Sequence, residues 1–315
     1  MRILTFLLMF AFIISGCGQK ESNVDGEKGT DFIIYTSIYP LQYFAERIGG
    51  DSVKVESIIP PGSDGHTYEP TTKELINISK ADLLIYNGAG FEGFVGKAKK
   101  SLESQDVSFL NASAHITEDE SEHEDGHEDE HHEHGDHEHG EIDPHLWLDP
   151  VYAIEMAHTI KDEMIKQRPE KKEEFEANFK ALKSDLAELD QKFEELAENA
   201  QRKEFIVAHS AYGNWEERYG LKQISVAGTS PSHEPSQKEA QAIIDFAQEN
   251  DVPYILFEKN ITSNVAKMIQ KDVDAEALYL SNLESLTEEQ MDQNEDYLRV
   301  MEENLTTLKK ALNSK

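Results

Sequence analysis

One long apolar stripe in the middle of the chain limits the folds that the chain can adopt. Seven large apolar residues recur at alternating spacings of four and three: Phe175, Phe179, Leu182, Leu186, Leu189, Phe193 and Leu196. This spacing places them on one face of an α-helix. We predict one helix from Pro169 to about Asn199, which at 1.5 Å per residue is roughly 45 Å long. Such a helix is typical either of a dimeric coiled coil or of a rigid connection between two lobes of one chain.

Strand-length apolar runs alternate with helical segments on both sides of this stripe, and they favour the connection between two lobes. The runs begin at Phe32, Val53, Leu83 and Val107 before the stripe, and at Phe205, Ile224, Tyr254 and Ala277 after it. Such alternation is typical of parallel βαβ packing. We therefore predict an α/β fold with two lobes, residues 31–168 and 201–315. Each lobe is a small parallel sheet with surrounding helices, and one long rigid helix at 169–200 joins them.

The amino terminus has the features of an export signal. The apolar run from Ile3 to Ile14 is too short to span a bilayer, and small residues follow it. The sequence Ile14-Ser15-Gly16-Cys17 is similar to a bacterial lipobox, which implies a signal peptide at 1–16 and lipid attachment to Cys17. The polar stretch 17–30 is typical of a flexible tether. An ordinary signal peptide with an incidental cysteine is the alternative.

Residues 117–141 cannot form a packed core by themselves. The segment contains thirteen Asp and Glu residues, no Lys or Arg and no apolar residue, so we predict that it is disordered. Imidazoles and carboxylates bind divalent metals. Its seven histidines predict an auxiliary loop that binds metal weakly: His123, His127, His131, His132, His134, His137 and His139. A solvated acidic linker is the alternative. The formal net charge of −32 argues against nucleic-acid binding.

Three other histidines lie among Gly, Pro, aromatic and small residues. His66 follows turn-forming residues after the second predicted strand, His145 lies between two prolines, and His209 stands at the carboxyl end of a predicted strand. Glu284 follows the last predicted strand. Ligands of open α/β sheets gather outside the carboxyl ends of the strands, so these positions indicate a site that draws on both lobes. Each histidine by itself is equally typical of a packed loop. The remaining three are interpreted as structural or left open: His115, His158 and His233.

Five sequence features occur in one order and together indicate a family. The lipobox is followed by Pro60-Pro61-Gly62-Ser63-Asp64-Gly65-His66-Thr67-Tyr68-Glu69-Pro70, the acidic histidine run, Asp143-Pro144-His145-Leu146-Trp147-Leu148-Asp149-Pro150 and Val207-Ala208-His209-Ser210-Ala211-Tyr212. The chain resembles the metal-binding solute-binding lipoproteins of bacterial ABC importers, cluster A-I, in their zinc-uptake branch. This resemblance covers nearly everything from Cys17 to Lys315. It implies two lobes joined by one long helix, with the metal in the cleft between them.

The resemblance also implies a set of ligands. By position, His66 and His145 bind the metal from the first lobe, His209 binds it from the second, and Glu284 is the fourth ligand, with water as the alternative. Manganese-preferring relatives have a carboxylate at the position of His209, which favours Zn²⁺ here. Independently, three neutral imidazoles and one carboxylate suit tetrahedral Zn²⁺, whereas Mn²⁺ prefers more oxygen ligands.

The implied function is the extracytoplasmic capture of Zn²⁺ by a lipid-anchored monomer, which delivers it to an ABC transporter permease without catalysing a reaction. Three alternatives stay open: a manganese-specific binding protein of the same family, a surface adhesin and a zinc-dependent hydrolase. The hydrolase is the least favoured, because the sequence contains neither an HExxH nor a G-x-S-x-G motif.

Overall fold

The computed structural model describes residues 32–116 and 142–313 of the chain. The predicted signal peptide, the lipid attachment at Cys17, the tether and the histidine-rich loop at 117–141 lie outside these residues. Within the described ranges, no helix has both the length and the apolar character needed to cross a membrane.

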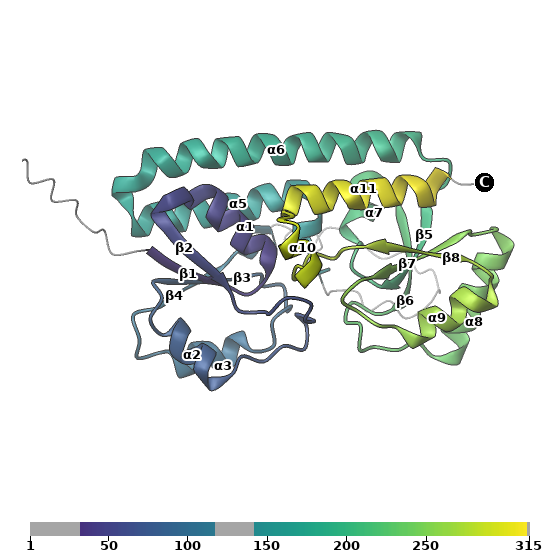
Figure 1. Ribbon diagram of the computed structural model, residues 1–315, viewed down its shortest axis with the longest axis horizontal. Helices are drawn as coiled ribbons and strands as arrows, with labels where there is room; N and C mark the ends of the chain where they lie inside the picture. Colours follow the sequence, from purple (N-terminus) through teal and green to yellow (C-terminus); the bar gives the residue numbers. More distant parts are fainter. Residues whose placement is uncertain (1–31, 117–141, 314–315) are drawn as a thin grey trace, which may run out of the picture. The chain divides into compact units, whose positions relative to one another are not determined.

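The first lobe is built on a parallel sheet with the strand order β2-β1-β3-β4 (Figure 1). Its strands are β1 (Phe32–Thr36), β2 (Val53–Ser57), β3 (Leu83–Tyr86) and β4 (Ser108–Asn111). Successive side chains of a strand point to opposite faces of the sheet. Ile34 and Ile85 pack on the side of α1 (Tyr39–Gly49) and α5 (Pro150–Gln167). Leu84 packs on the side of α2 (Thr72–Ile78) and α3 (Val95–Ser101).

The second lobe repeats this arrangement with the order β6-β5-β7-β8, again all parallel. Its strands are β5 (Glu204–His209), β6 (Lys222–Ala227), β7 (Tyr254–Glu258) and β8 (Glu276–Leu280). Ile206 and Ile255 pack against α8 (Gln237–Glu249) and α9 (Asn264–Asp272). The other face packs on the side of α7 (Asn214–Tyr219) and α11 (Tyr297–Asn313), and the short α10 (Glu288–Asp292) precedes α11. The predicted α/β fold is confirmed.

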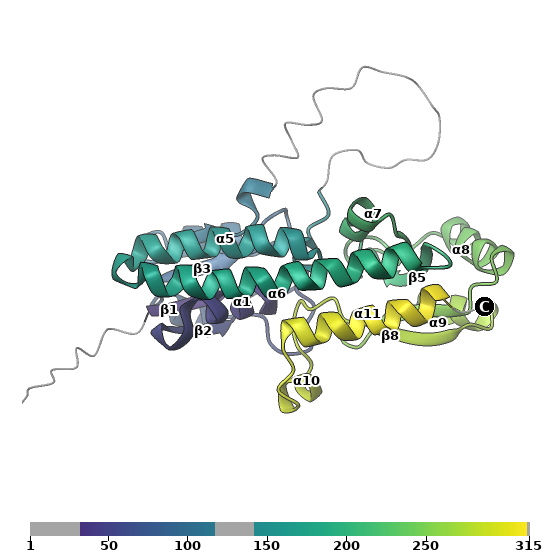
Figure 2. The ribbon, with the colours of Figure 1, turned by 90° about the horizontal axis from the view of Figure 1, so that it is seen from above.

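The predicted long helix is present as α6 (Lys172–Asn199), a single helix of 28 residues. It starts three residues later than predicted because Pro169–Lys171 form a 3-10 turn that leads into it. Five residues of the apolar stripe are fully or almost fully buried: Phe175, Leu182, Leu186, Leu189 and Phe193. The helix packs on α1 and α5 of the first lobe and on α11 of the second (Figures 1 and 2). The stripe is therefore buried within the chain, and the coiled-coil alternative is wrong.

A short buried segment ties the two lobes together. Leu146–Leu148 form a 3-10 turn, η3, whose three side chains have no exposed surface. The indole N–H of Trp147 donates to the carbonyl of Asn282, 2.7 Å away in the loop after β8. Tyr297, the first residue of α11, donates its hydroxyl to the Trp147 carbonyl at 2.6 Å. Because these contacts are buried and satisfied, they fix the segment that carries His145 against the second lobe.

Candidate metal centre

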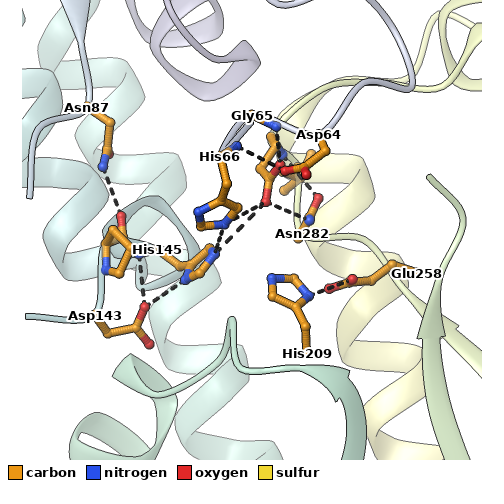
Figure 3. Close-up of polar contacts among 12 residues, drawn as sticks. Asp64, Gly65, His66, Asn87, Asp143, His145, His209, Glu258 and Asn282 are labelled. Carbon is orange, nitrogen blue, oxygen red and sulfur yellow. Dashed lines mark hydrogen bonds and ion pairs between the residues drawn. The ribbon is translucent and has the colours of Figure 1, made fainter. Parts of the chain in front are cut away.

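Four side chains that are far apart in the sequence meet between the two lobes. One ligand atom from each of His66, His145, His209 and Glu284 lies within 4.8 Å of the others. The last three residues are fully buried, and the His66 side chain is 9% exposed. Figure 3 shows the three imidazoles facing one another. Within the described parts of the chain, these residues form the one cluster of this kind.

The two candidate ligands in loops are held by hydrogen bonds with backbone and side-chain groups and by ring packing. His66 lies between β2 and α2, where its backbone N–H donates to Asp64 Oδ1 at 2.9 Å and its ring packs on Phe91 at 4.5 Å between centroids. Glu284 follows β8 and accepts from the backbone N–H of Gly65 at 2.8 Å and from Asn282 Nδ2 at 2.9 Å. The bond from Gly65 joins the loop of the first lobe to the carboxylate of the second, so the first lobe helps to orient Glu284.

The two remaining ligands stand at the ends of regular elements. His145 immediately precedes η3, and its backbone N–H donates to Asp143 Oδ1 at 3.0 Å. His209 is the last residue of β5. This strand lies inside the sheet, with a neighbour on each side, and its position fixes the backbone of His209. His66, His209 and Glu284 lie at or beyond the carboxyl ends of β2, β5 and β8, the region where parallel sheets bind their ligands.

The spacing of three of the four candidate ligand atoms is close to that around a small tetrahedral ion. His66 Nε2 lies 3.1 Å from His145 Nε2 and 3.5 Å from Glu284 Oε1, and His145 Nε2 lies 3.9 Å from the same oxygen. Metal–ligand bonds of about 2.0–2.1 Å in a tetrahedron place neighbouring ligands about 3.4 Å apart. His209 Nε2 is buried without a hydrogen-bond partner. Leaving a buried polar atom unpaired is costly, and coordination of an ion in the cluster removes that cost.

Two carboxylates hold imidazoles with the correct nitrogen facing the cluster. The Nδ1–H of His145 donates to Asp143 Oδ1 at 2.7 Å, and that of His209 donates to Glu258 Oε2 at 2.7 Å (Figure 3). An imidazole that donates from Nδ1 keeps the lone pair of Nε2 for a metal. The sequence analysis did not predict these two residues. The position of Asp143, two residues before His145, could have indicated it. The position of Glu258, at the carboxyl end of a predicted strand, could have indicated it in the same way.

The electrostatics of the cluster suit a divalent cation. Burial raises the pKa of Glu284, but the neighbouring histidines, led by His66, outweigh it and hold that pKa below its usual value. Burial also raises the pKa of Asp143, and His145 outweighs it in the same way. Burial lowers the pKa of His209, yet the Glu258 carboxylate beside it raises that pKa above its usual value. The buried carboxylates therefore supply negative charge that a bound divalent cation would neutralise.

His158 and His233 lie outside this cluster, and each has a polar contact elsewhere. His158 is exposed on α5 and pairs with Asp162 at 3.6 Å. His233 is exposed in the loop after β6, and its backbone N–H donates to the carbonyl of Ser230 at 3.0 Å. Neither joins the group of potential ligands.

Two parallel-sheet lobes, one connecting helix and a buried cluster of three histidines and a carboxylate define a solute-binding protein of cluster A-I whose solute is a metal ion. The family model described as "ZnuA: Zinc-uptake complex component A periplasmic" matches residues 34–311. This chain belongs to the ZnuA family. Its members are solute-binding proteins and not enzymes, which confirms the prediction that the chain is not an enzyme and makes the hydrolase alternative wrong.

Relatives extend over nearly the whole chain. The high-affinity zinc uptake system protein ZnuA of Bacillus subtilis is 37% identical over 309 residues, which cover 98% of this chain and 96% of that protein. The zinc-binding lipoprotein AdcA of Streptococcus pneumoniae is 33% identical over 95% of this chain, which spans only 58% of AdcA. The solved Zn(II)-bound ZnuA-like domain of that AdcA is 32% identical and superposes with a TM-score of 0.73, covering 90% of this chain and 100% of the domain.

Proposed function

We propose that this protein captures Zn²⁺ with His66, His145, His209 and Glu284 and delivers it to an ABC permease for import. The observation that carries the proposal is the convergence of four ligand atoms within 4.8 Å, drawn from both lobes and including the unpartnered His209 Nε2. Three nitrogens and one oxygen favour Zn²⁺ over Mn²⁺. The names of the relatives in Bacillus subtilis and Streptococcus pneumoniae support zinc as the solute.

The same proposal includes the parts of the chain outside the described residues. The signal peptide at 1–16 directs export, and Cys17 carries the lipid that anchors the protein outside the cytoplasm. The tether at 17–30 connects the lobes at 31–168 and 201–315 to this anchor. The protein acts as a monomer. The naming of AdcA as a lipoprotein supports the anchor. The histidine-rich loop at 117–141 supplies weaker metal sites. The adhesin alternative stays a prediction.

Competition with a zinc chelator tests the proposed site. The full chain is loaded with zinc and titrated with a chelator that removes weakly held metal first. We expect one tightly held zinc per chain, lost in His66→Ala and His209→Ala but kept in His158→Ala, an exposed histidine outside the cluster. The proposal fails if both cluster variants keep the tight zinc. Uptake of radioactive zinc by cells that express each variant as their only copy then tests import.

The fourth ligand is tested separately. Glu284→Gln keeps the size of the side chain but removes the negative charge that its histidine neighbours stabilise. If Glu284 binds the metal, this variant weakens the tight site while His158→Ala does not. Equal zinc affinity in Glu284→Gln and wild type would favour water as the fourth ligand.

A further inference from the structure

The two carboxylates behind the metal-facing histidines are themselves linked by a pair of adjacent residues. Asp143 gives Oδ1 to His145, and its other oxygen, Oδ2, accepts the backbone N–H of Gly213 at 3.0 Å. Glu258 gives Oε2 to His209, and its other oxygen, Oε1, accepts the hydroxyl of Tyr212 at 3.1 Å. A path of hydrogen bonds, joined through the Tyr212 side chain and the peptide bond to Gly213, thus runs from His145 in the first lobe to His209 in the second.

We propose that Tyr212 and Gly213, here called the brace, position His145 relative to His209 and thereby set the metal affinity and selectivity of the centre. The brace deepens the proposed function, since it acts on the same site, but neither of its residues touches the metal. Outer partners of ligating histidines fix ring orientation, and their loss typically lowers metal affinity about 10- to 100-fold. The brace differs from two independent partners because it couples them across the lobes.

The tyrosine half of the brace is rigidly held. Tyr212 is 1% exposed, and its ring packs on Trp215 with 4.7 Å between centroids. Its backbone N–H donates to Gln223 Oε1 at 3.1 Å, while Gln223 Nε2 donates to Ser210 Oγ at 3.1 Å. A side chain locked by packing and by hydrogen bonds holds its partner to a defined position. The Tyr212 hydroxyl can therefore fix the Glu258 carboxylate, and with it the ring of His209.

The glycine half of the brace is explained by close approach. Gly213 has φ −60°, which any residue adopts, so its backbone conformation does not require glycine. A Cβ at this position would lie 2.5 Å from Asp143 Oδ2 and 3.2 Å from Gln223 Nε2. Only a residue without a side chain lets its N–H reach the carboxylate of the opposite lobe. The identity of this residue is therefore tied to the contact with Asp143.

The segment that receives the brace is anchored to the second lobe at two further points. The indole N–H of Trp215 donates to the carbonyl of Leu148 at 2.8 Å, and Arg218 Nε donates to Asp149 Oδ2 at 2.7 Å. Both donors lie on α7, directly after the brace. Helix α7 therefore lies along the segment that carries His145. These two bonds and the brace together oppose a displacement of the His145 segment relative to the second lobe, which carries His209.

Tyr212→Phe is the sharpest test, because it removes one hydroxyl and keeps the buried ring. Its matched control is Tyr219→Phe, which removes a hydroxyl that donates to Asp190 at 2.8 Å, away from the cluster. Gly213→Ala is the second variant, with Gly96→Ala as its control, since a Cβ at Gly96 meets nothing within 4 Å. All are made in the full chain. Zinc affinity is measured by chelator competition, and the geometry of the centre by the absorption spectrum of Co²⁺ added at less than one equivalent.

We expect Tyr212→Phe and Gly213→Ala to lower zinc affinity by up to about tenfold, the low end of the range for direct partners of ligating histidines, and to change the Co²⁺ bands, while both controls keep the wild-type values. Zinc affinity should fall more than Mn²⁺ affinity, because Mn²⁺ does not demand a tetrahedral arrangement. Thermal melting of the metal-free proteins separates this effect from lost stability. If Gly213→Ala does not fold, Tyr212→Phe alone decides the matter.

The brace is refuted if Tyr212→Phe matches Tyr219→Phe in zinc affinity and Co²⁺ spectrum. That outcome leaves the proposed function intact, provided that the wild-type chain holds one tight zinc. If the wild-type chain holds no tight metal, the proposed function fails first, and the brace fails with it.

Discussion

At the scale of single residues, His209 is the candidate ligand on which the expected preference for zinc depends most. It ends β5, an inner strand of the second sheet whose pairing with β6 and β7 fixes its backbone, and its Nε2 is buried without a partner. Its other nitrogen is held by Glu258 at 2.7 Å. The ring is therefore presented to the cluster in one orientation and one tautomer, which a flexible surface histidine could not maintain.

Replacing His209 by Glu should move selectivity toward Mn²⁺. The change turns three nitrogens and one oxygen into two nitrogens and two carboxylates, which favour Mn²⁺ more than imidazole does. We expect the Zn²⁺/Mn²⁺ affinity ratio to fall, on the order of tenfold or more, although zinc should still bind more tightly. His209→Ala should lower both affinities. Chelator competition in protein lacking residues 118–140 measures the ratio without interference from the histidine-rich loop, and an unchanged ratio would mean that His209 is not a ligand.

The raised pKa of His209 predicts the pH dependence of zinc binding. Protons compete with metal for the imidazole, so affinity should fall as the pH drops through the raised pKa of His209, which lies above the usual value of about 6.5. Glu258→Gln removes the charge that raises this pKa, so the fall should begin at a more acidic pH. Titrations between about pH 8 and pH 5 measure the onset, with His158→Ala as the unchanged control. The same onset in wild type and Glu258→Gln would contradict this account.

At the scale of elements, α6 is the structural connection on which the arrangement of the site depends. Its buried face contacts helices of both lobes, and a large residue such as Leu186 has no exposed surface. Helices gain most of their stability from such packing and not from intrinsic propensity. The sequence predicted this helix well because its stripe is long and regular.

Leu186→Ala should destabilise the whole fold. Removing a fully buried leucine side chain typically costs about 2–5 kcal/mol through lost burial and the cavity that remains. Lys183→Ala, on the exposed face of the same helix, should change the free energy of unfolding by less than about 0.5 kcal/mol. Chemical denaturation measures both values. Similar stability in the two variants would show that the stripe is not packed against the lobes.

Other elements show where prediction from sequence succeeds and where it stops. The dipeptide Asp149-Pro150 is a typical helix start, and the Asp149 side chain caps α5 by accepting from the backbone N–H groups of Val151 and Tyr152. Helix α7 was not predicted, because six residues are too few to show a helical period. Helix α11 carries a clear period but was not assigned, although it buries Val300, Leu308 and Leu312.

For the candidate site too, some features could be predicted from the sequence and others could not. His66, His209 and Glu284 were predicted from strand ends, and the resemblance to a family implied these three residues together with His145. The contact between Glu258 and His209 was not, because it depends on β7 lying beside β5, and strand order cannot be read from the sequence. The bond from Gly213 to Asp143 likewise depends on how the two lobes meet. Partners of ligands are therefore harder to predict than the ligands themselves.

At the scale of the whole molecule, the cluster joins two lobes that each have their own sheet. Its ligands come together only in the folded chain, so a bound ion stabilises the folded state over the unfolded state. Direct bonds between the lobes, such as Trp147 to the Asn282 carbonyl and Gly65 to Glu284, already fix the neighbouring backbone. A bound ion would therefore add its bonds to contacts between the lobes that the protein already makes.

Zinc should therefore raise the melting temperature. When free zinc exceeds Kd a thousandfold, the expected stabilisation is about 4 kcal/mol. His209→Ala should show a smaller shift at the same zinc concentration, because it removes the ligand contributed by β5 of the second lobe. Calorimetry of the metal-free and zinc-loaded proteins measures the difference. Equal melting temperatures for the two forms of the wild-type chain would contradict a site that both lobes share.

X-ray absorption at the zinc edge tests the central claim most directly. The protein should lack residues 118–140, so that the histidine-rich loop contributes no signal, and should carry one equivalent of zinc. We predict that the shortened chain retains one tight zinc, bound by four nitrogen or oxygen ligands at about 2.0–2.1 Å, with the scattering pattern of three imidazoles. A shortened chain that retains no tight zinc, or a zinc bound by fewer than three imidazoles, would contradict a centre formed by His66, His145, His209 and Glu284.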